Sequence, residues 1–175
     1  PAALRATAFS GDLNLVGSLT LSPSPKGTLE LLAAGSINGL QPNGLDAVKY
    51  QWGSSRINLS DADPNRMPGI TAPLSLFYLG SAATVVEEWS AWSNPLPDVI
   101  NGVFANVNSL LNESGSREGA FGVLQTQLAL HASGPLHAGD PDPVRLYAQA
   151  GDVSGIALFS GKATRVVAGQ DITDI

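Results

Sequence analysis

The sequence predicts a mainly β protein built as a β-solenoid, in which short strands stack along one axis. Its clearest feature is a repeated pattern of an alternating apolar strand, a glycine turn and an apolar residue that opens the next strand. The pattern occurs at 8–13, 28–37, 144–153 and 164–172. Its copies align on the residue after the turn, which is Leu13, Ile37, Val153 or Ile172. Units of about 20 residues with one strand and one turn are typical of solenoids, in which each unit buries its apolar face on its neighbours.

The spacing of the copies predicts an insertion. The first two copies are 24 residues apart and the last two are 19 apart, whereas 116 residues separate the second from the third. We therefore expect β-rungs at 1–44 and 143–175, with an insertion of mixed α and β structure at 45–142. Solenoids accept such insertions because only one loop has to lengthen.

Composition agrees with this fold class and excludes several others. The chain of 175 residues has 19 glycines, 12 prolines and 14% charged residues, which favours many turns over long surface helices. Without cysteine there is no disulfide scaffold and no cysteine-ligated zinc. A formal charge of −6 opposes binding to nucleic acid and to anionic lipid. The longest apolar run, at 74–79, is too short to span a bilayer.

The first rung region shows the period of two that is typical of a half-buried strand. Apolar residues alternate with polar ones along it, and we expect the inward side chains to be Leu13, Leu15, Leu19 and Leu21. Two prolines and a glycine within 22–27 predict a turn or short loop there. Residues 143–175 show the same alternation and turns. Because the sequence starts at Pro1 and stops just after a strand has begun, we expect it to be a fragment of a longer protein.

The insertion is expected to contain at least one helix. Apolar residues lie at helical spacing between prolines and a glycine, which predicts an amphipathic helix at 97–113. Residues 74–79 and 123–130 read as strands. All three tryptophans, Trp52, Trp89 and Trp92, lie in the insertion.

Trp89 and Trp92 are the candidate binding residues. Tryptophan supplies a large rigid contact surface with a polar edge, which suits a platform for a sugar or a protein. The alternative is that both pack the insertion onto the rungs, which is the more common role of tryptophan.

Metal and catalytic motifs are incomplete. Asp61 and Asp63 begin like a calcium loop, but Arg66 and Ala72 stand where its glycine and glutamate are expected, so turn carboxylates are the simpler interpretation. A metal at the two histidines, His131 and His137, would need at least one more strong ligand, which only the nearby aspartates offer, so we expect surface or loop histidines. Neither a nucleophile elbow nor a phosphate-binding glycine loop occurs. We predict no catalytic set, no metal and no cofactor.

The rung segments resemble the filamentous haemagglutinin-like large exoproteins of Gram-negative bacteria. The resemblance rests on Leu-Leu-Ala-Ala-Gly-Ser-Ile-Asn-Gly-Leu at 31–40, Val-Arg-Leu-Tyr-Ala-Gln-Ala-Gly-Asp-Val-Ser-Gly at 144–155 and Lys-Ala-Thr-Arg-Val-Val-Ala-Gly-Gln-Asp-Ile at 162–172. It covers 1–44 and 136–175, and it implies a right-handed parallel β-helix that is secreted through an outer-membrane transporter in a two-partner system. The asparagine-proline-asparagine-leucine motif of the family's secretion module is absent, so the resemblance implies an interior segment.

The resemblance also implies a function in cell adhesion, at the bacterial surface or in the secreted state. The expected role is a rigid shaft whose insertion binds a glycan or protein on host or bacterial cells. One alternative is a polysaccharide-degrading β-helix enzyme, since Asp152 and Asp171 occupy equivalent turn positions and could lie side by side, although turn formation is their simpler role. Another is a purely structural spacer of a contact-dependent toxin carrier.

Overall fold

The computed structural model describes residues 2–43, 51–67, 70–71, 110–116 and 127–175, and this part of the chain is mainly β. Within these ranges most strands are short, and helical structure is confined to brief segments. The strands are β1 Ala3–Ala8, β2 Leu13–Asn14, β3 Ser18–Leu21, β4 Thr28–Ala33, β5 Ile37–Asn38, β6 Leu40–Asn43, β7 Gln51–Leu59, β8 Val144–Ala148, β9 Val153–Ser154, β10 Ile156–Ser160, β11 Thr164–Ala168 and β12 Ile172–Thr173. Two 3₁₀ turns, η1 Pro64–Arg66 and η3 Ser114–Ser116, and a helical segment at 127–130 accompany them.

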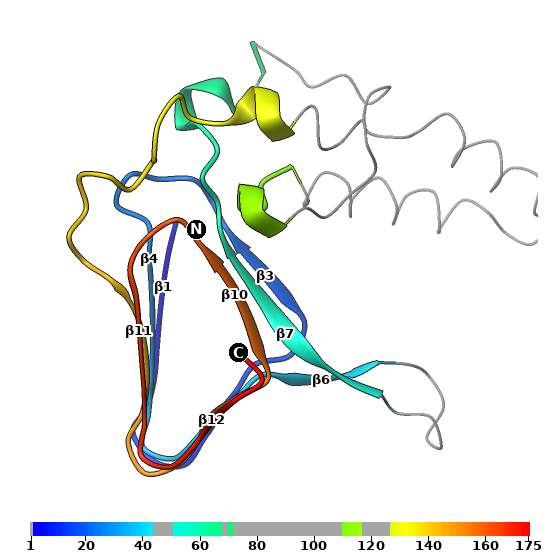
Figure 1. Cartoon of the computed structure of the whole chain (residues 1–175), viewed down its shortest axis with the longest axis vertical. Coiled ribbons are helices and arrows are strands. Elements are labelled where there is room, and N and C mark those ends of the chain that lie inside the picture. Colours follow the sequence, from blue (N-terminus) through cyan, green and yellow to red (C-terminus); the bar gives the residue numbers. More distant parts are fainter. Residues whose placement is uncertain (1, 44–50, 68–69, 72–109, 117–126) are drawn as a thin grey trace, which may run out of the picture.

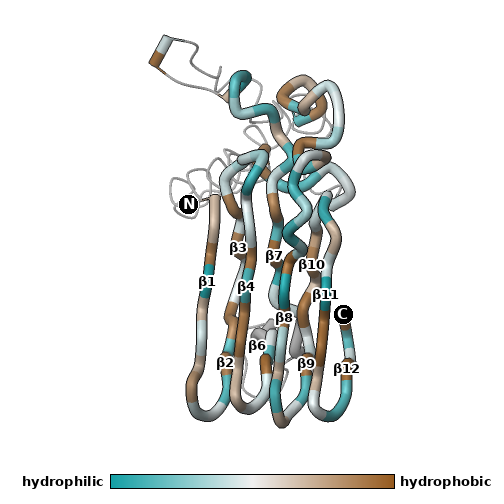
Figure 2. Tube along the Cα trace, turned by 90° about the vertical axis from the view of Figure 1, so that its left-hand side faces the viewer, coloured by the Kyte–Doolittle hydropathy of each residue, from teal (hydrophilic) through white to brown (hydrophobic). Residues whose placement is uncertain are grey.

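All of these strands except β6 form three parallel sheets, which lie along the three sides of a triangle (Figure 1). The first sheet has the order β1-β4-β8-β11, the second β2-β5-β9-β12 and the third β3-β7-β10. The chain visits the sheets in the same sequence each time, through β1, β2 and β3, then β4, β5 and β7, then β8, β9 and β10. Figure 2 shows these successive passes lying side by side along one axis. We refer to this arrangement as the three-sheet stack.

The register confirms the alignment of the four sequence copies. Leu13 pairs with Ile37, Ile37 with Val153, and Val153 with Ile172. In the first sheet β4 pairs in parallel with β8, so that the segments at 28–37 and 144–153 are neighbours although more than a hundred residues separate them. The chain outside the repeats therefore leaves and re-enters the stack without disturbing its register.

The core lies inside the triangle and explains the alternation of the sequence. The inward side chains of β4, β7 and β8 are buried, and among the most deeply buried are Leu29, Leu31, Ile57, Leu59, Val144 and Leu146. Leu13, Leu15, Leu19 and Leu21 pack against or within this cluster, as their period predicts. Each large aliphatic side chain that is fully buried contributes about 1.5–3 kcal/mol of favourable transfer free energy.

Polar side chains join successive passes at the turn between the first and second sheets. The Asp12 carboxylate accepts a hydrogen bond from the backbone N–H of Ser36 at 2.7 Å. The Ser36 hydroxyl accepts from the N–H of Asp152 at 3.1 Å, and the Asp152 carboxylate accepts from the N–H of Asp171 at 2.9 Å. A Cβ atom added at Gly151 would overlap the Ser36 hydroxyl, so a larger residue there would displace a side chain that joins the passes.

The structure moves the first boundary of the predicted insertion. Residues 51–59 fall inside the predicted 45–142 segment, yet β7 pairs in parallel with both β3 and β10. It also pairs with β6 in an antiparallel hairpin. Ile57 and Leu59 point inward at the period of a strand, but no glycine turn of the repeated pattern precedes them, which is why the sequence analysis left β7 out. The segment between consecutive passes is therefore 60–143.

Part of the predicted secondary structure of the insertion can be compared with the structure. The strand predicted at 123–130 is wrong where it is described, because residues 127–130 are helical. Gln127 and Leu130 are buried while Leu128 is 65% exposed, which is the spacing of one helical turn rather than of a strand. Of the helix predicted at 97–113, the described end forms a turn at 110–111. Its remainder and the strand predicted at 74–79 lie outside the described residues.

Candidate binding surface

The outer face of the first sheet carries two ladders of side chains that cross all four strands. The parallel register aligns Arg5 with Glu30, Arg145 and Arg165 in one ladder. In the other it aligns Thr7 with Leu32, Tyr147 and Val167. Side chains alternate between the two faces of a strand, so these residues point away from the core that their neighbours fill. A charged row and a mostly apolar row thus lie next to each other.

The charged ladder has an excess of cations. Arg145 lies 3.2 Å from the Glu30 carboxylate and 3.7 Å from Asp142, so its charge is compensated. Arg165 instead places its guanidinium carbon 5.9 Å from the centre of the Tyr147 ring, in a cation–π contact. Within the described residues, no carboxylate pairs with Arg165. This face of an acidic protein is therefore locally basic.

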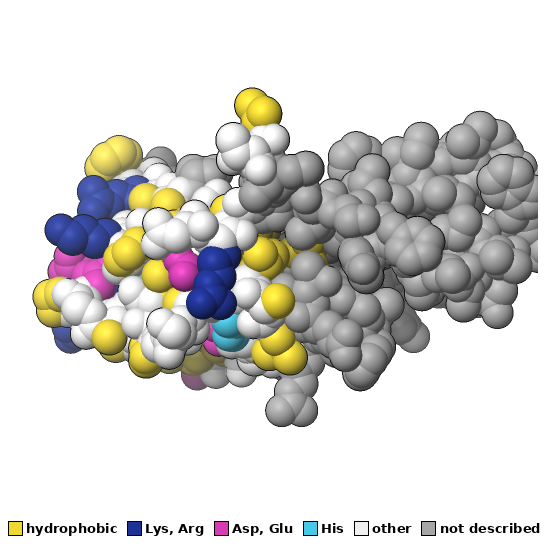
Figure 3. Space-filling model, turned by 90° about the horizontal axis from the view of Figure 1, so that it is seen from above, with side chains coloured by type: hydrophobic (Ala, Val, Ile, Leu, Met, Phe, Trp, Pro, Cys, Tyr) yellow, Lys and Arg dark blue, Asp and Glu magenta, His cyan; other side chains and the backbone are white. Residues whose placement is uncertain are grey.

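An open groove of about 690 Å³ runs over the same face. The outward-facing side chains along it are mainly apolar or aromatic, with one cation and a few polar groups, and they include Thr7, Phe9, Leu32, Tyr147, Gln149, Arg165 and Val167. Phe9 is 92% exposed and Val167 is 43% exposed. In Figure 3 basic, acidic and hydrophobic side chains gather over this sheet, at the left of the view. Such a groove offers one charged partner and an apolar floor to a ligand.

A second polar cluster lies where the chain leaves the third sheet. The Asp61 carboxylate accepts hydrogen bonds from the backbone N–H of Ser114 at 3.2 Å and from the Ser114 hydroxyl. The His131 Nε2 atom lies 3.1 Å from Asp61 Oδ1, outside hydrogen-bond geometry. Burial is the main cause that raises the pKa of Glu113, and the charge of Asp61 adds to it. The serine hydroxyl donates to the carboxylate and not to the imidazole, which is not the order that activates a serine nucleophile.

The predicted calcium-loop residues fulfil other roles. The Asp63 carboxylate caps η1 by accepting from the Asn65 N–H at 2.9 Å, and it lies 3.5 Å from the Arg66 guanidinium. The structure places Asp61 next to His131, as a metal site shared by the two would require. The Asp61 oxygens, however, accept hydrogen bonds from Ser114. Over the described ranges, no group of three or more acidic, histidine or cysteine side chains is placed to hold a metal ion.

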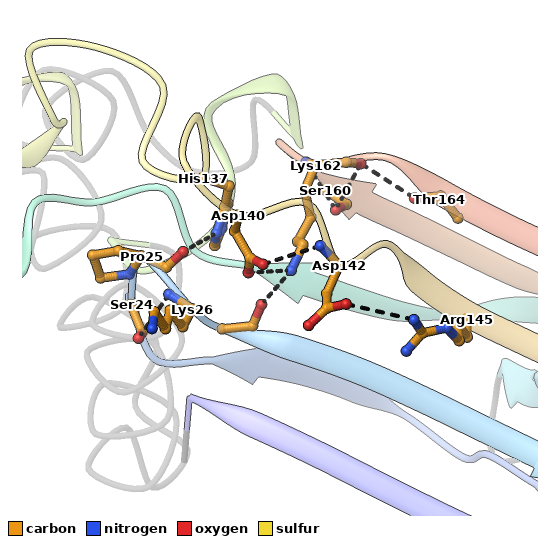
Figure 4. A network of polar contacts seen from close by, with 11 residues as sticks. Ser24, Pro25, Lys26, His137, Asp140, Asp142, Arg145, Ser160, Lys162 and Thr164 are labelled. Carbon is orange, nitrogen blue, oxygen red and sulfur yellow. Dashed lines mark hydrogen bonds and ion pairs between the residues drawn. The ribbon is translucent and has the colours of Figure 1, made fainter.

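A buried lysine, Lys162, joins the connections that run between the third and the first sheet (Figure 4). Lys162 Nζ donates to Asp140 Oδ2 at 2.7 Å and to the Gly27 carbonyl at 3.0 Å. The Lys162 side chain is 2% exposed and that of Asp140 10% exposed. The hydrogen bond from Lys162 is the main cause that lowers the pKa of Asp140. His137 lies in a loop, as one of the two expected settings, but it is buried and not at the surface, with its Nδ1 atom 3.4 Å from the Pro25 carbonyl. We call this set the lysine clasp, and it ties 132–143 to 22–27 and 161–163.

The candidate binding residues named from the sequence are not placed by the structure. Trp89 and Trp92 lie outside the described residues, and Trp52 lies in β7 with its side chain undescribed. Asp152 and Asp171 are neighbours as predicted, and Asp152 accepts a backbone N–H as a turn residue.

The sequence analysis missed the basic and aromatic residues of the outer face. Their signal was present, because Arg145 and Arg165 occupy the same position in two copies of the repeat and Tyr147 and Val167 follow two residues later. The prediction used only the inward, apolar positions of those copies.

Comparisons with known proteins identify no relative: no family model, no curated protein and no solved structure matches this chain. No helix within the described ranges has the length and apolarity that crossing a bilayer would need.

Proposed function

We propose that the three-sheet stack is a right-handed parallel β-helix and that this chain is a shaft segment of a secreted, adhesin-like bacterial exoprotein. The handedness follows from the strong preference of parallel crossover connections for a right-handed path. The shaft provides reach and rigidity, and the segment between its passes provides attachment to a glycan or protein on host or bacterial cells. The resemblance to filamentous haemagglutinin-like exoproteins in the repeats agrees with this role.

The observation that carries the proposal is the register of β4 on β8. These strands pair residue for residue across a sequence separation of 115 positions, as the contact of Arg145 with Glu30 illustrates. The stack is thus one continuous rod, and 60–143 leaves it at the corner where 22–27 and 161–163 make short connections. A rod that carries one long inserted segment at a corner suits presentation of that segment to another surface.

A deletion that restores a short connection tests the proposal. Residues 60–143 are replaced by a three-residue Gly-Ser-Ala bridge, which has the length of 161–163. Lys162→Met is added because the deletion removes Asp140 and would leave a buried cation without its partner. We expect this variant to remain β-rich by circular dichroism and to unfold cooperatively, because every strand of the stack is retained.

Attachment is then measured with beads that carry the intact or the deleted chain. We expect the intact chain to retain epithelial or bacterial cells under washing and the deleted chain to lose this ability. A Trp89→Ala, Trp92→Ala double variant of the intact chain should weaken attachment as well. If the intact chain fails to attach, a structural spacer is the better interpretation; if the deleted chain attaches equally well, the insertion is not the adhesive segment.

A further inference from the structure

We propose that the groove on the outer face of the first sheet binds a terminal, carboxylate-bearing sugar of a glycan, with Arg165 as the partner of the carboxylate. This site lies on the shaft and not on the segment between the passes. It therefore goes beyond the proposed function, and it does not require that the chain attach to cells.

The positive charge of Arg165 favours a ligand that carries a carboxylate. A guanidinium binds a carboxylate through two parallel hydrogen bonds, which makes arginine the preferred partner for such groups. Arg145 already contacts Glu30 and Asp142, whereas no carboxylate within the described residues pairs with Arg165. The cation–π contact with Tyr147 places the Arg165 guanidinium beside the groove.

The rest of the groove has the chemistry that a sugar ring needs. Sugars present an apolar face of C–H groups and a rim of hydroxyls, and they pack against aromatic rings with the hydroxyls paired to polar groups. Tyr147, Leu32 and Val167 supply apolar surface, while Gln149 and Thr7 supply an amide and a hydroxyl at its edges.

A single acidic sugar fits better than a polyanion. Among the described residues, Arg165 is the only arginine that borders the groove. Arg5 stands at the far end of the ladder and does not line it. The net charge of −6 repels polymers that carry a charge at every unit. The ligand is therefore a glycan whose one carboxylate lies at its terminus, and not a repeating uronate chain or a nucleic acid.

The test uses 3′-sialyllactose as the acidic probe and lactose as its neutral counterpart. The intact, isotope-labelled chain is titrated with each sugar and followed by amide resonances. We expect saturable shifts from 3′-sialyllactose that map to residues of the groove, and binding of lactose that is weaker by about tenfold or more, the factor expected from a charged hydrogen bond. Equal binding of the two sugars, or shifts that map elsewhere, would overturn the proposal.

Two matched variants assign the charge. Arg165→Gln keeps a planar hydrogen-bonding group but removes the cation and shortens the side chain, and we expect it to weaken 3′-sialyllactose binding by about tenfold. Arg5→Gln changes the same ladder outside the groove, and we expect it to leave the affinity unchanged. Equal losses in both variants would indicate a diffuse charge effect and sink the assignment, as would tighter binding of a hyaluronan oligosaccharide than of 3′-sialyllactose.

The readout separates this inference from the proposed function. Sugar binding is measured in solution on the intact chain and again on the deletion variant, which retains all four strands of the first sheet. We expect the deleted chain to bind 3′-sialyllactose as the intact chain does, even where it no longer retains cells. Loss of sugar binding on deletion would show that the groove is not the site.

Discussion

The inner and outer faces of the first sheet belong to the same four strands but follow different rules. Toward the core the register aligns Ala8, Ala33, Ala148 and Ala168 in one ladder, and Ala6, Leu31, Leu146 and Val166 in another. Toward solvent the same strands align Arg5, Glu30, Arg145 and Arg165. Inward positions are all apolar because they fill the closely packed space between the sheets. Outward positions are free to differ, and the chemistry able to bind a ligand lies there.

Truncation of one inward side chain should give the largest difference between the faces. Leu146 is fully buried, and Leu146→Ala is expected to lower the free energy of unfolding by about 2–5 kcal/mol, because it removes apolar contact and leaves a cavity. Val167→Ala, on the outer face of the neighbouring strand, should stay within about 0.5 kcal/mol. Urea unfolding of both variants measures this. Similar losses would mean that the two faces are equally packed.

The turn between the first and second sheets should give an intermediate effect. Gly151→Ala places a methyl group against Ser36 of the neighbouring pass and should cost about 1–3 kcal/mol through overpacking. Gly134→Ala is the control, since a Cβ atom there meets no heavy atom within 4 Å. Thermal unfolding of the pair checks the prediction, and a tolerated Gly151→Ala would show that the passes can move apart.

The outer ion pair should give the smallest effect. A double-mutant cycle with Glu30→Gln and Arg145→Gln is expected to yield a coupling energy of about 0.2–1 kcal/mol that falls as salt is added. Both side chains are only partly buried, so water screens their attraction. A coupling energy of several kcal/mol would mean that this ion pair stabilises the protein as much as a core contact does, and the two faces would then not differ.

The sequence predicts the repeated part of the fold because each copy contains its own evidence. The glycine turn and the alternating strand identify four passes, and the residues after the turns pair as aligned. The repeat does not predict β7, because Ile57 and Leu59 alternate with polar residues but no glycine turn precedes them. For short apolar segments, alternation alone is shared by too many structures to place a strand in a particular sheet.

The polar clusters could not be predicted because their members are remote in sequence. Asp61, Ser114 and His131 meet only where the chain leaves the third sheet, and no local spacing links them. The lysine clasp likewise joins Lys162 to Asp140 and to the carbonyl of Gly27. By contrast, the groove residues were predictable in principle, since Arg165 and Arg145 share one position of the repeat.

The long excursion between β7 and β8 has a consequence for how the chain folds. Contacts between the first two passes, and between the last two, close loops of 24 and 19 residues, whereas Glu30 and Arg145 close one of 115. Loop-closure entropy grows only with the logarithm of length, so the longer closure costs about 1.4 kcal/mol more than the 24-residue one. Each half of the stack has local contacts that form quickly, and the halves meet in a slower step that depends on the segment between them. A large segment at this corner therefore lowers the free energy of unfolding only slightly, and it mainly slows folding.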